Sequence, residues 1–199
     1  MKVGVCAWGS LIWDPRNLRT QGDFIPTGPR LPLEFSRISG PDGRRRLTLV
    51  VDEKNGTPCR TFVAQSPFSN VGDAIDNLAA REGLYHKEDV GWAVSVPGTA
   101  SGRAVSRHPS AVRGIEEFLD QTDFDAIIWT ALQSNFTARL PDGVAFSVRR
   151  VLRVLSDDFS QSERQASIDY MRRAPVDVGT PLRAAVEGRA RGSAEVNIT

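Results

Sequence analysis

The chain has 199 residues, with 25 basic and 24 acidic side chains and a formal net charge of +1. Hydrophobic residues make up 40% and charged residues 25%, which is ordinary for a soluble globular protein and excludes disorder throughout. No apolar run approaches the roughly 18 residues of a membrane span, and the N-terminus is typical of a strand rather than a signal peptide. We therefore expect a cytoplasmic protein with no membrane partner, and the balanced charge argues against general nucleic-acid binding.

The residues that could bind a metal are few and scattered. The cysteines are Cys6 and Cys59, and the histidines are His86 and His108. A structural zinc site takes about four such ligands at characteristic spacings, and no such spacing occurs here. Glycine-rich nucleotide-binding motifs do not occur either. The sequence therefore predicts no metal site, no cofactor, and two buried thiols in a reducing compartment.

The first third of the chain has the pattern of short strands separated by turns. A β-branched run at 3–6 ends at a glycine-containing turn, and the Gly-Pro-Asp-Gly sequence at 40–43 is a strong turn signal. The strands on either side of that turn are expected to form a hairpin. The expected strands are 3–6, 33–38, 46–51 and 60–64, and 14–32 should be mostly loop or short strand.

The hydrophobic period then changes to that of a helix. Apolar residues at spacings of three and four predict a helix over 70–81. Asn70 is expected to cap its start and Gly83 its end. Glu82 therefore lies where this helix stops.

The rest of the chain mixes helices and strands irregularly. Ser160 and Glu163 have the spacing of a capping box at the start of a helix. This order of elements predicts an α+β fold with a mixed or antiparallel sheet, or a small barrel, and flanking helices. We expect one domain over 1–175 and a C-terminal extension over 176–199. The expected elements are strands at 90–96 and 125–132, a loop at 97–109, helices at 111–119, 160–173 and 181–188, a strand at the start of 144–155, and a frayed tail after 188.

Two local features could support chemistry. The turn at Gly9 and Ser10 can leave consecutive backbone N–H groups free to bind a carboxylate or an oxyanion, although a simple tight turn has the same sequence. Glu82 lies at the negative end of a helix dipole, which carboxylates usually avoid. Two interpretations of Glu82 therefore remain open: a functional group, or an exposed side chain at a helix end.

Other candidate sites have weaker signals. Arg44, Arg45 and Arg46 could form a phosphate-binding patch with 149–153, but a solvated hairpin edge has the same composition. Ser10 lacks the sequence context of a hydrolase nucleophile, and no known spacing pairs it with a histidine. A nucleic-acid or phosphate binder remains an alternative.

Two segments together resemble the γ-glutamylcyclotransferase-like family, most closely its ChaC-like branch. The sequence AWGSLIWDP at 7–15 resembles the family's first-strand signature. From 60 to 92, a strand leads into a helix that ends in Glu-Gly, and another strand follows. The resemblance covers 1–96 with motifs and 125–173 by element order alone. It implies the fold of that family and assigns Glu82 to the position of its catalytic acid and base.

The resemblance also implies a reaction that needs no cofactor. A γ-glutamyl group cyclises to 5-oxoproline when its α-amine attacks its own γ-carbonyl, and one carboxylate can take and return the proton. The N–H groups of Gly9, Ser10 and Leu11 would hold the carboxylate or carbonyl oxygen, and Trp8 would form a wall. The expected partner is a small γ-glutamyl amide, amine or peptide.

Two departures from the family keep a second hypothesis open. Trp8 stands where most members have tyrosine, and Glu88 and Asp89 stand where many have a tyrosine downstream of the glutamate. The alternative is a catalytically inactive module on the same fold that binds a small carboxylate or a protein. The oligomeric state and the leaving group are left open by the sequence.

Overall fold

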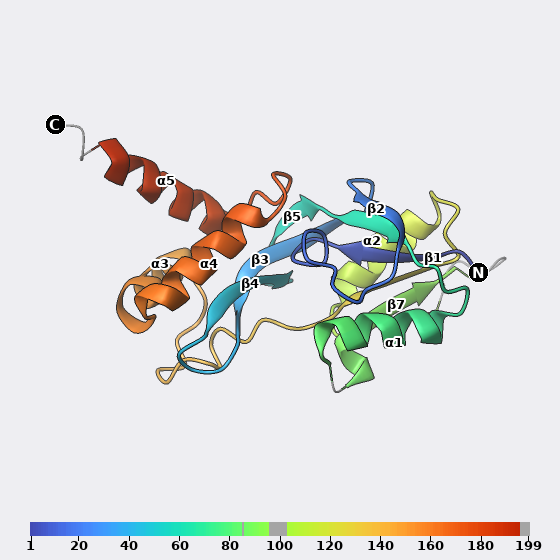
Figure 1. Cartoon of the computed structure of the whole chain (residues 1–199), viewed down its shortest axis with the longest axis horizontal. Helices are drawn as coiled ribbons and strands as arrows, with labels where there is room; N and C mark the ends of the chain where they lie inside the picture. The colour runs from blue at the N-terminus through green and yellow to red at the C-terminus, as the bar shows by residue number, and fades with distance from the viewer. Residues whose placement is uncertain (85, 96–102, 196–199) are drawn as a thin grey trace.

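The structure is a computed structural model that describes residues 1–84, 86–95 and 103–195 (Figure 1). Within these ranges the strands form two sheets. The strands are β1 (Val3–Ala7), β2 (Gln21–Ile25), β3 (Arg30–Ser39), β4 (Arg46–Val51), β5 (Thr57–Arg60), β6 (Phe62–Gln65), β7 (Val90–Val94), β8 (Arg103–Val105) and β9 (Ala126–Thr130).

The larger sheet is mixed and the smaller one is antiparallel. The larger sheet has the order β2-β6-β1-β9-β7-β8, in which β1 and β9 run parallel. The smaller sheet has the order β4-β3-β5, and β3 and β4 form the expected hairpin. With helices packed around both sheets, the predicted α+β class is confirmed.

The strand expected at 60–64 is instead two strands in different sheets. β5 pairs with β3, whereas β6 pairs with β1. The break falls at Thr61, whose N–H and hydroxyl both donate to the carbonyl of Pro29. The sequence at 60–64 gave no sign of the break because the chain is extended on both sides of Thr61. Thr61 therefore marks where the chain passes from one sheet to the other.

The helix expected at 70–81 is present, shifted by one residue, and Glu82 is its last residue. The helices are α1 (Val71–Glu82), α2 (Pro109–Leu119), α3 (Val148–Arg153), α4 (Gln161–Arg173) and α5 (Pro181–Glu195), with a 3-10 turn η1 (Lys87–Asp89) and a π-helical turn η2 (Val154–Asp158). The Asn70 side chain accepts hydrogen bonds from two N–H groups of the first turn of α1. Gly83 ends α1 in the left-handed region at φ 65°, where a side chain would be strained.

The C-terminal third differs from the prediction at several points. No strand forms at 144–147, because Ser147 caps the start of α3 with its side chain. The capping box of Ser160 and Glu163 is confirmed at the start of α4. α5 continues to Glu195, beyond the expected end at 188. β8 occupies part of the loop expected at 97–109, while 96–102 lie outside the described residues.

The core is divided by the larger sheet. α1 packs on one face through Ala74 and Leu78, where it covers a smaller apolar cluster (Figure 1). The other helices and the smaller sheet enclose a larger cluster, which includes Val178 and Leu182 from the segment beyond residue 175. None of the described helices combines the length and apolarity needed to cross a membrane.

Candidate functional site

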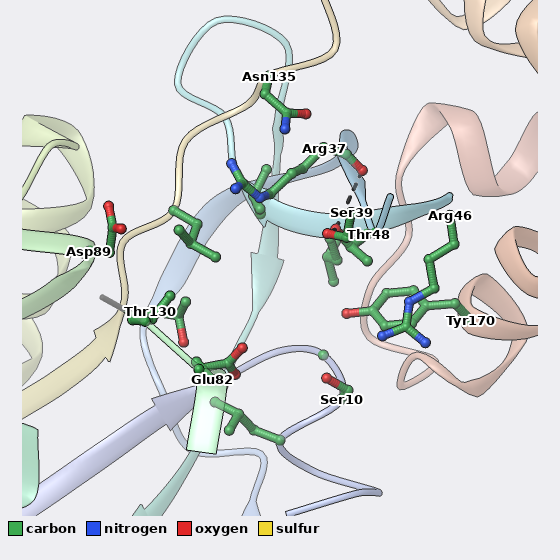
Figure 2. Close-up of a pocket in the computed structure, with 18 of the residues that line it drawn as sticks. Ser10, Arg37, Ser39, Arg46, Thr48, Glu82, Asp89, Thr130, Asn135 and Tyr170 are labelled. Carbon is green, nitrogen blue, oxygen red and sulfur yellow. Dashed lines mark hydrogen bonds between the residues drawn. The ribbon is translucent and has the colours of Figure 1, made fainter. Parts of the chain in front are cut away.

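A cavity of about 460 Å³ opens where the two sheets, the end of α1 and α4 meet. It lies between the turn after β1 and the β3–β4 hairpin (Figure 2). Its lining includes all five residues that the family resemblance assigned to a site: Trp8, Gly9, Ser10, Leu11 and Glu82. Arg81 donates a hydrogen bond to Ser10, although the two residues are 71 positions apart in the sequence. The fold thus brings the turn after β1 and the end of α1 together.

The turn after β1 presents backbone N–H groups near the cavity. Its carbonyls are used locally, because Gly9 O accepts from Ile12 N and Ser10 O accepts from Asp14 N. Among the residues that the structure describes, the N–H groups of Gly9, Ser10 and Leu11 donate to no backbone carbonyl. These donors have the character expected of an anion-binding turn.

Trp8 forms a fixed part of the cavity wall. Its side chain is only 5% exposed, and its indole N–H donates to the carbonyl of Leu49 on β4 at 3.3 Å. This bond joins the end of β1 to the hairpin. The indole therefore both shapes the cavity and ties its two sides together.

Arg81 links Glu82 to the turn after β1. Its side chain is 1% exposed, and its guanidinium donates to Glu82 Oε1 at 3.0 Å. The other terminal nitrogen donates to Ser10 Oγ at 3.3 Å and to the carbonyl of Asp14. The orientation of the carboxylate is thereby coupled to the turn that supplies the N–H donors.

The carboxylate of Glu82 is protonated more readily than that of an exposed glutamate. Its side chain is 19% exposed, and burial raises its pKa above the usual value. The positive charges of Arg81, Arg16 and Arg46 act in the opposite direction, but burial has the larger effect. A carboxyl group with a raised pKa is suited to exchange protons near neutral pH.

Tyr170 on α4 is a cavity residue that the sequence did not single out. Its ring is 7% exposed and makes an edge contact with Trp13, at 5.3 Å between ring centroids. The Arg46 guanidinium lies over the same ring, 5.1 Å from its centroid. Figure 2 shows the phenol, Arg46 and Ser10 on the same side of the cavity.

The Tyr170 hydroxyl remains protonated at the turn. Burial raises the pKa of the phenol, and the backbone and hydroxyl of Ser10 only partly offset this. A Cβ on Gly9 would lie 2.6 Å from Tyr170 Oη, so the close approach requires glycine. Glu163 and Tyr170 lie seven positions apart, which is two helical turns, and both are buried on α4. This spacing was the one signal in the sequence that could have placed Tyr170 on the inner face of the helix.

Two of the three hairpin arginines, Arg44 and Arg46, are exposed, as in the solvated edge that the sequence suggested. Arg45 differs, because it is half-buried and bonds to the buried Glu163 on α4. Arg46 also lines the cavity. The alternative phosphate patch would lie outside this cavity, since Arg149, Arg150 and Arg153 are not among its lining residues. The sequence also gave no sign of the basic residues Arg37 and Arg139 in the lining.

Among the described residues, no three His, Cys, Asp or Glu side chains are grouped closely enough to bind a metal ion. Cys6 lines the cavity, but burial raises its thiol pKa to about 12. The thiol is therefore protonated and poorly suited to act as a nucleophile. His86 also lines the cavity, while Tyr85 lies outside the described residues.

Comparison of the sequence with protein-family models gives no match, and comparison with curated proteins gives none.

Proposed function

We propose that the chain is a cyclotransferase that converts a γ-glutamyl amide, amine or small peptide into 5-oxoproline and a free amine. One observation carries the proposal: Glu82, with its raised pKa, shares a cavity with the N–H groups of 9–11, which donate to no backbone carbonyl of the described residues. The resemblance of both segments to γ-glutamylcyclotransferase-like proteins supports the same reaction and the same fold.

In the proposed reaction the substrate rearranges within itself. The α-amine nitrogen forms a bond to the γ-carbonyl carbon, and the bond from that carbon to the leaving nitrogen breaks. Glu82 takes a proton from the attacking amine and gives it to the leaving amine, so the carboxylate is restored. Because both reacting groups belong to one molecule, positioning provides much of the acceleration.

The other cavity residues hold the substrate for this step. The N–H groups of Gly9, Ser10 and Leu11 and the guanidinium of Arg46 are suited to bind the α-carboxylate or the developing oxyanion. The hydroxyl of Tyr170, on the same side, is a neutral hydrogen-bond donor for these oxygens. Arg81 acts as a positioning residue, because it bonds to both Glu82 and Ser10.

Release of 5-oxoproline from γ-glutamyl amino acids, γ-glutamyl amines and glutathione tests the proposal. The wild type is expected to release it from at least one of these. Glu82→Gln is expected to lower turnover by about 100-fold or more, which is the usual contribution of general acid–base catalysis. Its melting temperature should stay within about 2 °C of the wild-type value.

Glu117→Gln is the matched control, because Glu117 is exposed on α2 and is not among the cavity residues. It should keep wild-type turnover. Wild-type turnover in Glu82→Gln would overturn the assigned role of Glu82.

A second candidate is a binding module for small carboxylates on the same fold. The observation that favours it is the number of cavity arginines, which would retain an anion without any reaction. In that case γ-glutamyl compounds would raise the melting temperature of the wild type and remain unconsumed after prolonged incubation.

A further inference from the structure

Thr130, the last residue of β9, carries a hydroxyl group that takes no part in the steps proposed above. Thr130 lines the cavity, and its Oγ1 atom is buried. Among the described residues, no group forms a hydrogen bond with this oxygen. A buried hydroxyl group without a partner destabilises a fold relative to an apolar group of the same shape. Packing alone therefore gives no reason for threonine rather than valine here, which points to a role in the site.

The order of the strands sets the directions in which α1 and β9 run. β1 and β9 are parallel to each other, β6 is antiparallel to β1, and β7 is antiparallel to β9. β6 and β7 therefore run in the same direction, and α1 lies between them in the chain. A helix that connects two parallel strands returns antiparallel to both, so α1 runs in the same direction as β9. The C-terminal ends of α1 and β9 thus lie at the same end of the larger sheet.

The side chains near these two ends are matched in position. Leu78 of α1 and Ile128 of β9 belong to the same buried cluster. Glu82 lies one helical turn beyond Leu78, about 6 Å along the helix. Thr130 lies two positions beyond Ile128 on the same face of the sheet, about 7 Å along the strand. Glu82 and Thr130 therefore reach the cavity together, and Figure 2 shows the hydroxyl group of Thr130 directed toward Glu82.

The carboxylate of Glu82 can accept a further hydrogen bond. Its Oε1 accepts one from Arg81 at 3.0 Å, and within the described parts of the chain no second residue donates to it. Hydrogen bonds at catalytic groups are often long before substrate binds and tighten in the complex. Because a hydroxyl hydrogen rotates freely, the Thr130 hydroxyl group can donate to the carboxylate once substrate displaces water from the cavity.

We propose that Thr130 is a positioning residue, whose hydroxyl group donates a hydrogen bond to the ionised carboxylate of Glu82 in the substrate complex. This inference rests on the proposed function. The bond directs the carboxylate toward the attacking amine and stabilises the form of Glu82 that accepts the proton. It also makes protonated Glu82 a stronger acid, so that the proton passes more readily to the leaving amine.

Thr130→Val tests the inference, because valine keeps the shape of the side chain and lacks the hydroxyl group. With the best γ-glutamyl substrate, kcat is expected to fall about tenfold while KM stays within about twofold, since Thr130 acts on Glu82 and not on the substrate. The acid limb of the kcat profile should move up by about one pH unit, because the ionised form of Glu82 loses a hydrogen bond.

Thr130→Ser keeps the hydroxyl group and serves as the rescue variant. Its kcat should stay within about threefold of wild type, with the acid limb unmoved. Thr137→Val is the matched control, because Thr137 is exposed in the segment after β9 and is not in the cavity lining. It should behave as wild type. The melting temperature of Thr130→Val should equal or exceed that of the wild type, since the hydroxyl group that it lacks has no partner among the described residues.

The remaining outcomes separate the two proposals. Wild-type kcat and an unmoved acid limb in Thr130→Val would overturn the inference and leave the cyclotransferase reaction in place. A raised KM with unchanged kcat would do the same, because the hydroxyl group would then bind substrate. A kcat of Thr130→Ser as low as that of Thr130→Val, or a lower melting temperature of Thr130→Val, would assign Thr130 to packing and overturn the inference as well. If the wild type releases 5-oxoproline from no γ-glutamyl compound, the proposed function fails and the inference fails with it.

Discussion

Two glutamates, each beside an arginine, occupy opposite electrostatic situations. Glu82 ends α1, where the helix dipole is unfavourable, and it accepts a hydrogen bond from Arg81. Glu163 lies in the first turn of α4, where the dipole is favourable. It accepts hydrogen bonds from the backbone of Ser160 and from the backbone and guanidinium of Arg45. The pKa of Glu82 is raised, whereas that of Glu163 is lowered.

The difference shows that an adjacent arginine does not determine the state of a buried carboxylate. Burial has the largest effect on Glu82 and raises its pKa, whereas hydrogen bonds from Arg45 and Ser160 have the larger effect on Glu163 and lower its pKa. Glu163 is fully satisfied and holds the hairpin against α4. Glu82 is desolvated and only partly satisfied, so its protonation can change during a reaction. We therefore assign a structural role to Glu163 and propose a catalytic role for Glu82.

Removing the partner of Glu163 should give the largest effect on stability. Arg45→Ala leaves the Glu163 carboxylate, which is 2% exposed, without its guanidinium partner. We expect a loss of about 3 kcal/mol in the free energy of unfolding, as for other broken buried pairs. Urea denaturation of Arg45→Ala and wild type measures it.

The control for this change lies next to it in the chain. Arg44→Ala should change the free energy of unfolding by less than about 0.5 kcal/mol, because surface substitutions usually do. If Arg45→Ala costs no more than Arg44→Ala, the structural role of the Arg45–Glu163 pair is wrong.

The position of Glu82 could be predicted from the sequence, whereas the pairing of Glu163 with Arg45 could not. The position of Glu82 at a helix end depends on local signals, Asn70 before the helix and Gly83 after it, and the structure has both. The capping box of Glu163 was local as well. Its bond to Arg45 spans 118 residues and depends on how the hairpin packs on α4, which no local pattern reports.

The cavity residues also fall into two groups, those that local sequence signals indicate and those that depend on tertiary packing. Trp8, Gly9, Ser10 and Leu11 follow a strand and a turn that the sequence shows directly. Tyr170 and Arg37 enter the cavity only because the two sheets meet at Thr61 and α4 packs on β4. The sequence therefore predicted the α+β class and one side of the cavity, and it missed the side that depends on tertiary packing.

The pH dependence of stability should have opposite signs for the two glutamates. Because the pKa of Glu163 is lowered, its contribution is present above the unfolded value, about 4.3, and is lost as pH falls through the folded value. Because the pKa of Glu82 is raised, protonated Glu82 stabilises the fold below about pH 4.3, and this contribution is lost as pH rises through the folded value.

Chemical denaturation of Glu163→Gln and Glu82→Gln between about pH 3.5 and 7.5 measures both effects. The stability of Glu163→Gln relative to wild type should fall as pH rises, by about 1.2 kcal/mol over this range. That of Glu82→Gln should rise. A relative stability of Glu82→Gln that falls with pH would show that its arginine neighbours outweigh burial.

The smallest effect concerns Tyr170, which lies on the helix of Glu163 and contacts the turn beside Glu82. Gly9 does not have a positive φ, so alanine is compatible with its backbone. The obstacle is the Tyr170 hydroxyl, 2.6 Å from the new Cβ, whereas the ring carbon behind it is 3.7 Å away. Gly9→Ala should therefore cost about 1 kcal/mol in the wild type, as modest overpacking does.

The same substitution should cost almost nothing in Tyr170→Phe, because the ring carbon is at an ordinary contact distance. A double-mutant cycle of Gly9→Ala and Tyr170→Phe, measured by urea denaturation, gives the coupling directly. Equal costs of Gly9→Ala in both backgrounds would mean that another contact excludes a side chain at Gly9. A coupling close to the full cost would identify the Tyr170 hydroxyl as the group that requires glycine in the turn beside Glu82.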